Sequence, residues 1–266
     1  MKIAAFNAQR FGLAKVSDPD VLSILIKIVS RYDIIVILEV VDVSGASITQ
    51  LLAELNRVNT SHHYALQLST RLGRTRYKEQ FMFLYRDDVV DLIDSYQYED
   101  NQVNDTDVFL REPYILFFKP RNTVLKNLVL IPVHAASQDS KRELDELYEV
   151  FLVVRDKWKT DNVMILGDFR ADGVIVVFGE EMLKAIVPKS AKPFNFPEEF
   201  SLTEEMALRV SDHYPVEVEF TSTSPFWIRK TKKRHRSVES QPVQRVVTGK
   251  DNNCNLLCLV TGRYGM

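Results

Sequence analysis

The chain has 266 residues, 45% of them hydrophobic and 26% charged, which is the composition of an ordinary globular domain with a buried core. Its 34 basic and 36 acidic side chains nearly balance, so the bulk charge does not point to a nucleic-acid partner. The two cysteines, Cys254 and Cys258, lie together near the C-terminus, which excludes a disulfide framework in the body and leaves no second pair to complete a zinc site.

Short β-type runs alternate with helical patterns from residue 1 to about residue 220. Strands are predicted at residues 3–6, 34–38, 81–85, 115–118, 128–133, 163–166, 175–178 and 216–220. Apolar residues spaced three and four apart predict helices at residues 17–29, 46–56 and 142–158. This alternation predicts one α/β domain over residues 1–220.

The composition changes after residue 220. Residues 221–266 are polar, then densely basic, then polar again, and we expect a basic, largely disordered tail. Residues 229–236 carry six Lys and Arg side chains, a cluster that suits DNA phosphates, anionic lipid or a nuclear import receptor. A solvated tail without a partner is an equally good interpretation.

The N-terminus enters a short apolar run directly, so no secretory signal peptide is expected. No apolar run is long enough to span a membrane, and stable membrane insertion is not expected. Glycosylation sequons begin at Asn59 and Asn104, and they matter only if the chain enters the secretory pathway.

Polar side chains follow four of the predicted strands. They are Asn7 after residues 3–6, Glu39 after 34–38, His134 after 128–133 and Asp168 after 163–167. If these strands run the same way, the four side chains meet at one rim, where α/β proteins build their sites. An antiparallel strand at 216–220 would bring Asp212 and His213 to the same rim.

Glu79 lies on the aromatic face of a predicted strand, because strand alternation groups it with the large apolar residues of the segment 77–85. A buried carboxylate needs a partner, and His134 is the natural candidate. A carboxylate that orients a histidine makes that histidine a usable general acid or base.

Taken singly, an Asn or Glu after a strand is more often a turn residue, and a lone His is more often structural. Together, carboxylates at one rim repel each other unless a cation holds them. Oxygen ligands without thiols suit Mg²⁺, Mn²⁺ or Ca²⁺. A hard cation with histidines nearby suits attack by water on a phosphate ester.

Several motifs in fixed order resemble those of the deoxyribonuclease I family over nearly all of residues 1–220. They are "KIAAFNAQRFG", "YDIIVILEVVD", "LGRTRYKEQFMFLYR", "FLREP", "LIPVHAA", "LYEVF", "VMILGDFRAD" and "LTEEMALRVSDHYPVEVEF". "FNAQR", "EVVD" and the basic tail look closer to the deoxyribonuclease I-like paralogues than to the pancreatic enzyme.

The resemblance implies a four-layer α/β/β/α sandwich of two mixed sheets, of the endonuclease/exonuclease/phosphatase type. It implies hydrolysis of DNA phosphodiester bonds with Mg²⁺, and Ca²⁺ in support. Carried over by motif, it implies catalytic Glu79, His134 and His213; metal-binding Asn7, Glu39, Asp168 and Asp212; DNA-contacting Tyr77, Arg111 and Arg170; and a calcium loop with Asp100, Asp107 and Glu112.

The chain departs from the family pattern after "GDFRAD", which runs almost at once into "VIVVFGEE". A stretch of the core domain is therefore expected to be missing after residue 172, and with it the family's Asp that supports the second histidine. His213 is expected to lack its partner. Arg170 stands where the family has Asn and brings a positive charge toward the metal.

The leading hypothesis is a metal-dependent endonuclease acting on DNA, with activity impaired by these departures. The alternatives are another phosphoesterase of the same superfamily and a catalytically dead nucleic-acid-binding module. Actin binding is not carried over, because "HYALQL" does not reproduce the apolar contact run. The resemblance suggests secretion or the endoplasmic reticulum, the basic tail suggests the nucleus, and we expect a monomer.

Overall fold

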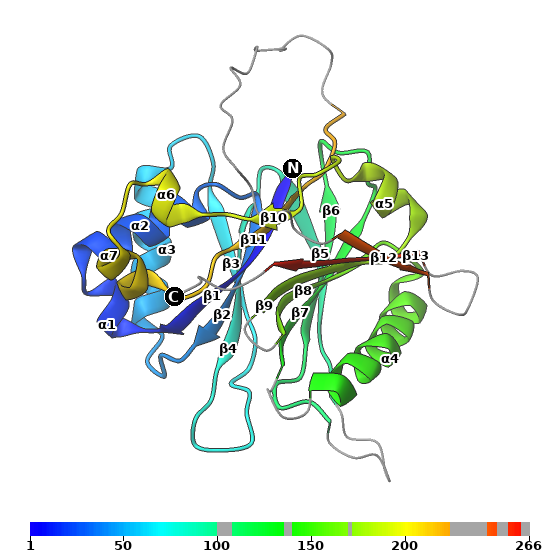
Figure 1. Cartoon of the computed structure of the whole chain (residues 1–266), viewed down its shortest axis with the longest axis horizontal. Coiled ribbons are helices and arrows are strands. Elements are labelled where there is room, and N and C mark those ends of the chain that lie inside the picture. The colour runs from blue at the N-terminus through cyan, green and yellow to red at the C-terminus, as the bar shows by residue number, and fades with distance from the viewer. Residues whose placement is uncertain (100–107, 136–139, 170–171, 224–243, 249–254, 262–266) are drawn as a thin grey trace.

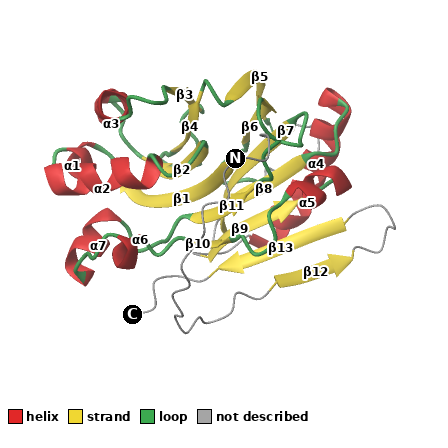
Figure 2. Cartoon of the chain, turned by 90° about the horizontal axis from the view of Figure 1, so that it is seen from above, coloured by secondary structure: helices red, strands yellow, loops and turns green. Residues whose placement is uncertain are grey.

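The structure is a computed structural model that describes residues 1–99, 108–135, 140–169, 172–223, 244–248 and 255–261. Two β-sheets pack face to face, with helices on their outer faces (Figures 1 and 2). The predicted four-layer α/β/β/α sandwich of two mixed sheets is confirmed. No helix of the described residues is both long and apolar enough to cross a membrane.

The first sheet has six strands in the order β10-β11-β1-β2-β4-β3. They are β1 (Lys2–Phe11), β2 (Ile34–Val40), β3 (Tyr64–Leu68), β4 (Gln80–Arg86), β10 (Lys192–Pro193) and β11 (Val216–Glu219). β1 and β2 run parallel, and the other pairs are antiparallel. The sheet is therefore mixed, as predicted.

The second sheet has the strand order β12-β13-β9-β8-β7-β6-β5. They are β5 (Val90–Gln97), β6 (Tyr114–Pro120), β7 (Leu128–Ala135), β8 (Val163–Phe169), β9 (Asp172–Val177), β12 (Gln244–Thr248) and β13 (Asn255–Thr261). β7 and β8 form its parallel pair. Each sheet thus has one parallel pair near its middle.

Helices cover the two outer faces. α1 (Leu13–Val16), α2 (Pro19–Val29), α3 (Ala46–Val58), α6 (Phe196–Glu199) and α7 (Glu204–Val210) lie on the first sheet's side in Figure 1, and α4 (Ser140–Trp158) lies on the other. α5 (Glu180–Ala185) instead packs Met182 and Ala185 into the core between the sheets. α2 begins two residues after the predicted start at residue 17, because Asp18 caps its first backbone N–H groups and Pro19 occupies its first turn.

Strand alternation separates the core into layers. Ile3 and Ala5 of β1 point toward the second sheet and pack with Leu130 and Leu166, while Phe6 points toward α2 and its neighbours. A further cluster joins α4 to the outer face of the second sheet. Burial on both faces explains why the central strands read as nearly continuous apolar runs.

The strand that follows β8 in the chain pairs directly with β8. β9 pairs antiparallel with β8, with Asp172 opposite Phe169 and Val174 opposite Gly167. The segment that directly follows "GDFRAD" therefore forms a strand at the position next to β8, and the sheet has no gap there.

The edge of β9 that faces away from β8 is also paired. β13 runs antiparallel along it, with Leu259 opposite Ile175, and β12 pairs with β13. Both strands fall in the expected tail 221–266, so in these two segments the structure differs from the expected disorder. The physical reason is that an unpaired strand edge offers a row of backbone donors and acceptors. The basic cluster at 229–236 lies outside the described residues.

Candidate active site

The ends of the two parallel strand pairs meet between the sheets. His134 of β7 lies directly opposite Asp168 of β8 in the register. Asn7 of β1 donates one amide hydrogen bond to Glu39 Oε1 (2.8 Å) and another to Asp168 Oδ2 (2.9 Å). The structure therefore brings these four predicted residues from four strands and both sheets into one cluster.

Asn7 faces the two carboxylates with its nitrogen. Its Oδ1 accepts the backbone N–H of Gln9 at 2.9 Å, and this bond fixes the orientation of the amide group. In this orientation the nitrogen of Asn7, and not its oxygen, faces Glu39 and Asp168, and its role as a metal ligand stays a prediction. Asn7 sets the positions of Glu39 and Asp168.

A backbone irregularity holds Glu39. The β1–β2 register shifts between Asn7 and Phe11, and Gln9, Arg10 and Glu39 all have positive φ angles of 48°, 55° and 58°. Such angles are uncommon for residues other than glycine and concentrate at functional sites. The bulge presents the Arg10 N–H to Glu39 Oε2 at 2.9 Å.

Asp168 is 4% exposed, and its Oδ1 has no hydrogen-bond partner among the described residues. Burial raises the pKa of Asp168, but attraction by His213, the hydrogen bond from Asn7 and the charge of His134 outweigh it, so the pKa lies below its usual range. Asp168 is therefore an ionised carboxylate with one oxygen free for a cation.

Glu79 supports His134 as the sequence predicts. Glu79 is 3% exposed, and its Oε2 lies 2.8 Å from His134 Nδ1. Burial raises the pKa of Glu79, but His134 and Arg111 outweigh it and hold the pKa below its usual range. His134 Nε2 points the other way and lies 3.6 Å from Glu39 Oε1.

Arg111 serves the same cluster. Its Nη2 donates to Glu79 Oε1 and its Nε lies 2.7 Å from Glu79 Oε2, while its Nη1 donates to the His134 carbonyl at 3.2 Å. These donors bind Glu79 and the backbone of His134, and contact of Arg111 with the DNA backbone stays a prediction. Such a bidentate fork holds Glu79 in one rotamer.

Tyr77 is 45% exposed at the edge of the cluster. Partial burial, followed by the negative charges of Glu79 and Glu39, raises the pKa of Tyr77 to about 12. Its phenol therefore stays protonated at neutral pH. The phenol is an exposed, neutral hydrogen-bond donor beside the site, and its contact with substrate stays a prediction.

His213 has a carboxylate partner, contrary to expectation. Its Nδ1 lies 2.6 Å from Oδ1 of the preceding residue, Asp212, and its Nε2 lies 3.3 Å from Asp168 Oδ2 without the alignment of a hydrogen bond. Burial lowers the pKa of His213, but Asp168 and Asp212 outweigh it and raise the pKa. The neighbouring aspartate thus takes the place expected to be empty.

The cluster suits a hard divalent cation. Glu39 and Asp168 supply two carboxylates, and Asp168 Oδ1 is buried and unpartnered. Mg²⁺ commonly binds through one or two carboxylates together with water and substrate phosphate. Among the described residues no group of three or more His, Cys, Asp or Glu side chains is placed to hold a metal ion, so an ion bound by these two carboxylates needs substrate or water to complete its shell.

Three predicted residues lie outside the described part of the chain: Arg170, Asp100 and Asp107. Glu112 is described, and its carbonyl oxygen accepts a bond from the Gln97 side chain at 3.1 Å. The predicted calcium loop and the position of Arg170 stay predictions.

The sequence reasoning missed Lys15 and Ser211. Lys15 of α1 donates to the Val210 carbonyl, and burial, partly offset by the charges of Asp212 and Glu39, lowers its pKa to about 8. The Ser211 hydroxyl donates to the Asn7 carbonyl at 2.7 Å. Ser211 lies beside the singled-out Asp212, and that position is the signal that could have revealed it.

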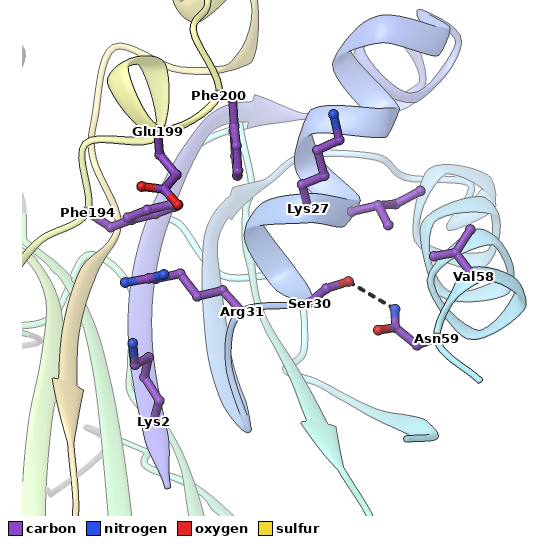
Figure 3. Close-up of a pocket in the computed structure, with 10 residues that line it drawn as sticks. Lys2, Lys27, Ser30, Arg31, Val58, Asn59, Phe194, Glu199 and Phe200 are labelled. Atoms are coloured by element: carbon purple, nitrogen blue, oxygen red, sulfur yellow. Dashed lines mark hydrogen bonds between the residues drawn. The ribbon is translucent and has the colours of Figure 1, made fainter. Parts of the chain in front are cut away.

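A separate pocket of about 590 Å³ opens between the ends of α2 and α3 and the segment 194–200 (Figure 3). None of the predicted site residues lines it. Arg31 binds Glu217 through two nitrogens, and the Asn59 amide donates to Ser30 and to the Leu55 carbonyl. These polar groups already have partners, so they do not call for a ligand.

Residues 4–169 match the Endonuclease/Exonuclease/phosphatase family. Deoxyribonuclease-1-like 1 of Bos taurus is 41% identical over 258 residues, covering 82% of this chain and 80% of that protein. Deoxyribonuclease-1-like 2 of Mus musculus is 38% identical over 259 residues, covering 83% and 91%. Deoxyribonuclease gamma of Mus musculus is 33% identical over 287 residues, covering 89% and 92%.

The two-sheet sandwich and its cluster of carboxylates and histidines define a phosphoesterase of the endonuclease/exonuclease/phosphatase class. The chain belongs to the deoxyribonuclease I family within that class. The resemblance read from the motifs is confirmed.

Proposed function

We propose that this chain is a divalent-metal-dependent endonuclease that hydrolyses phosphodiester bonds of DNA. The observation that carries the proposal is Asp168, a buried ionised carboxylate with a free oxygen, held within one cluster with Glu39 and two histidines. The similarity to deoxyribonucleases supports DNA as the substrate class.

Glu39 and Asp168 would hold the cation, and Asn7 would fix their spacing. Mg²⁺ fits the oxygen ligands, Mn²⁺ is a chemical substitute, and Ca²⁺ would support the fold at a separate site. When bound, the ion would stabilise negative charge on the phosphoryl oxygens.

His134 and His213 would handle protons. Each has a carboxylate at Nδ1, and each directs Nε2 toward a carboxylate of the cluster. A histidine oriented in this way accepts a proton from water or donates one to a leaving oxygen through Nε2. Tyr77 would contact the DNA backbone or sugar through its phenol, and Arg170 would approach a phosphate.

We also propose that activity is lower than in the relatives. The alignment with mouse deoxyribonuclease gamma is longer than the 266 residues of this chain, so that relative carries residues inside the aligned region that have no counterpart here. This supports an internal loss. Arg170 adds a cation that competes with the metal.

Two other functions stay open as candidates. A catalytically dead DNA-binding module is favoured by Arg170 and the internal loss, and the basic residues 229–236 would supply salt-sensitive attraction to phosphates. Another phosphoesterase activity of the same superfamily is chemically compatible with the cluster. We propose a monomer that does not bind actin, and entry into the secretory pathway as in the family, with the nucleus as the alternative.

Nicking of supercoiled plasmid tests the proposal, with Mg²⁺ plus Ca²⁺ in one series and a chelator in the other. We expect metal-dependent nicking that is slower than that of an intact relative. DNA binding without cleavage would identify the dead module. Turnover of phosphomonoesters or phospholipid headgroups in preference to DNA would identify the second alternative.

A further inference from the structure

The site contains two carboxylate–histidine pairs of the same geometry. Glu79 Oε2 lies 2.8 Å from His134 Nδ1, and Asp212 Oδ1 lies 2.6 Å from His213 Nδ1. The opposite ring nitrogens face the metal carboxylates: His134 Nε2 lies 3.6 Å from Glu39, and His213 Nε2 lies 3.3 Å from Asp168. The pairs therefore approach the same centre from two directions.

Asp212 differs from the other carboxylates of the cluster. It is 39% exposed at the side chain, whereas Asp168 is buried. Asn7 bridges Glu39 and Asp168 but makes no bond to Asp212. The Oδ1 atom of Asp212 lies 2.6 Å from His213 Nδ1, so this carboxylate is paired with the histidine and not with Asn7.

The backbone on both sides holds this pair in place. The Ser211 hydroxyl donates to the Asn7 carbonyl at 2.7 Å and accepts the His213 N–H at 3.0 Å, and Ser211 is 1% exposed. Lys15 donates to the Val210 carbonyl on the other side. The Asp212 pairing therefore rests on an anchored loop and not on one free side chain.

We propose that Asp212 is the positioning residue of His213 and not a metal ligand: it holds the imidazole proton on Nδ1 and leaves Nε2 to face the scissile phosphate. A carboxylate at Nδ1 fixes both the tautomer and the ring orientation of a histidine. The expected effect of Asp212 on cleavage rests on the proposed nuclease function, whereas the expected tautomer of His213 does not.

The first measurement is the tautomer of His213, read from ¹⁵N chemical shifts and long-range ¹H–¹⁵N couplings at alkaline pH, where the ring is neutral. We expect the Nδ1–H form in the wild-type chain and a shift toward the Nε2–H form in Asp212→Ala. Asp87→Ala removes the matching partner of the exposed His63 and serves as the control that leaves His213 unchanged. An unchanged His213 tautomer in Asp212→Ala would overturn the proposal.

The second measurement separates orientation from metal binding. In Asp212→Ala we expect kcat to fall about a hundredfold at saturating Mg²⁺, with the half-saturating Mg²⁺ concentration unchanged within about twofold. Asp212→Asn keeps an oxygen that can accept from Nδ1 and should recover part of kcat. A large rise in half-saturating Mg²⁺, with kcat restored at high Mg²⁺, would show a metal ligand instead. If the wild-type chain does not cleave DNA, the proposed function fails while the tautomer result still decides this inference.

Discussion

Asn7 Nδ2 lies 2.9 Å from Asp168 Oδ2, and this hydrogen bond joins a strand of the first sheet to a strand of the second, 161 residues away. The same nitrogen binds Glu39. The amide thus bridges the two carboxylates and offsets part of their mutual repulsion. The site is held together across the sandwich before any ion arrives.

Replacing Asn7 with Asp tests this role, because it puts a third negative charge between two others. We expect Asn7→Asp to have a lower thermal midpoint than wild type in chelator. Added Mg²⁺ should raise the midpoint of the variant by more than it raises that of wild type. Differential scanning fluorimetry with and without Mg²⁺ measures both effects. Asn195→Asp adds the same charge at the N-cap of α6, where Asp is a good cap, and should change neither value. Equal behaviour of the two variants would contradict the assigned role.

Glu79 gives a prediction about pH and stability. Because its folded-state pKa is lowered, its contribution is fully present above the ordinary glutamate pKa of about 4.3 and is lost as pH falls through the folded value. We expect Glu79→Gln to cost about 1–3 kcal/mol near pH 7 and to show a flatter loss of unfolding free energy on acidification. Urea denaturation at a series of pH values measures this.

The control for this comparison is Glu54→Gln, which removes a carboxylate paired with the exposed Arg57 on α3. Its stability curve should run parallel to wild type, since exposed pairs contribute little. If Glu79→Gln also runs parallel, its carboxylate does not bind His134 and Arg111 as described.

Gly167 allows Asp168 to reach the site. Its φ is +154°, and a Cβ at this position would lie 1.9 Å from the Val133 carbonyl oxygen. We expect Gly167→Ala to destabilise the chain by at least about 2 kcal/mol, because β7 and β8 would have to separate. Gly12→Ala is the matched control, since its nearest neighbour atom lies 3.6 Å away and its φ of −172° is extended. Similar thermal midpoints for the two variants would refute the close approach.

Arg170 gives a prediction from the sequence alone. If its guanidinium competes with the cation, Arg170→Asn should raise kcat several-fold and lower the half-saturating Mg²⁺ concentration. Plasmid nicking across a Mg²⁺ series measures both. Arg57→Asn removes one exposed cation from α3 and controls for the change in net charge. No gain over that control would mean that Arg170 points away from the site.

Much of the site could be predicted because its polar residues directly follow apolar strand runs or take a fixed place in the alternation of a β-strand. The apolar runs before Asn7, Glu39, His134 and Asp168 lie in two parallel pairs, and such strands end at the same rim. Burial of Glu79 followed from alternation, and its need for a partner pointed to His134. These inferences use only local pattern and the cost of a buried charge.

Other features depend on geometry that no local pattern encodes. The orientation of Asn7 depends on a bulge with consecutive positive φ angles at Gln9 and Arg10, neither of which is glycine. The Asp212–His213 pair depends on the rotamers of adjacent side chains in an anchored loop. β12 and β13 were missed because their pairing depends on the edge that β9 leaves free, far away in sequence.

Cleavage of supercoiled plasmid by Asp168→Asn, measured beside wild type in Mg²⁺ and in chelator, tests the central claim most directly. The change keeps the size of the side chain, and it removes the negative charge and one of the two oxygens that could hold the ion. We predict Mg²⁺-dependent cleavage by wild type and a loss of at least about a thousandfold in the variant. Cleavage by Asp168→Asn at the wild-type rate, or equal cleavage by wild type in chelator, would contradict the account.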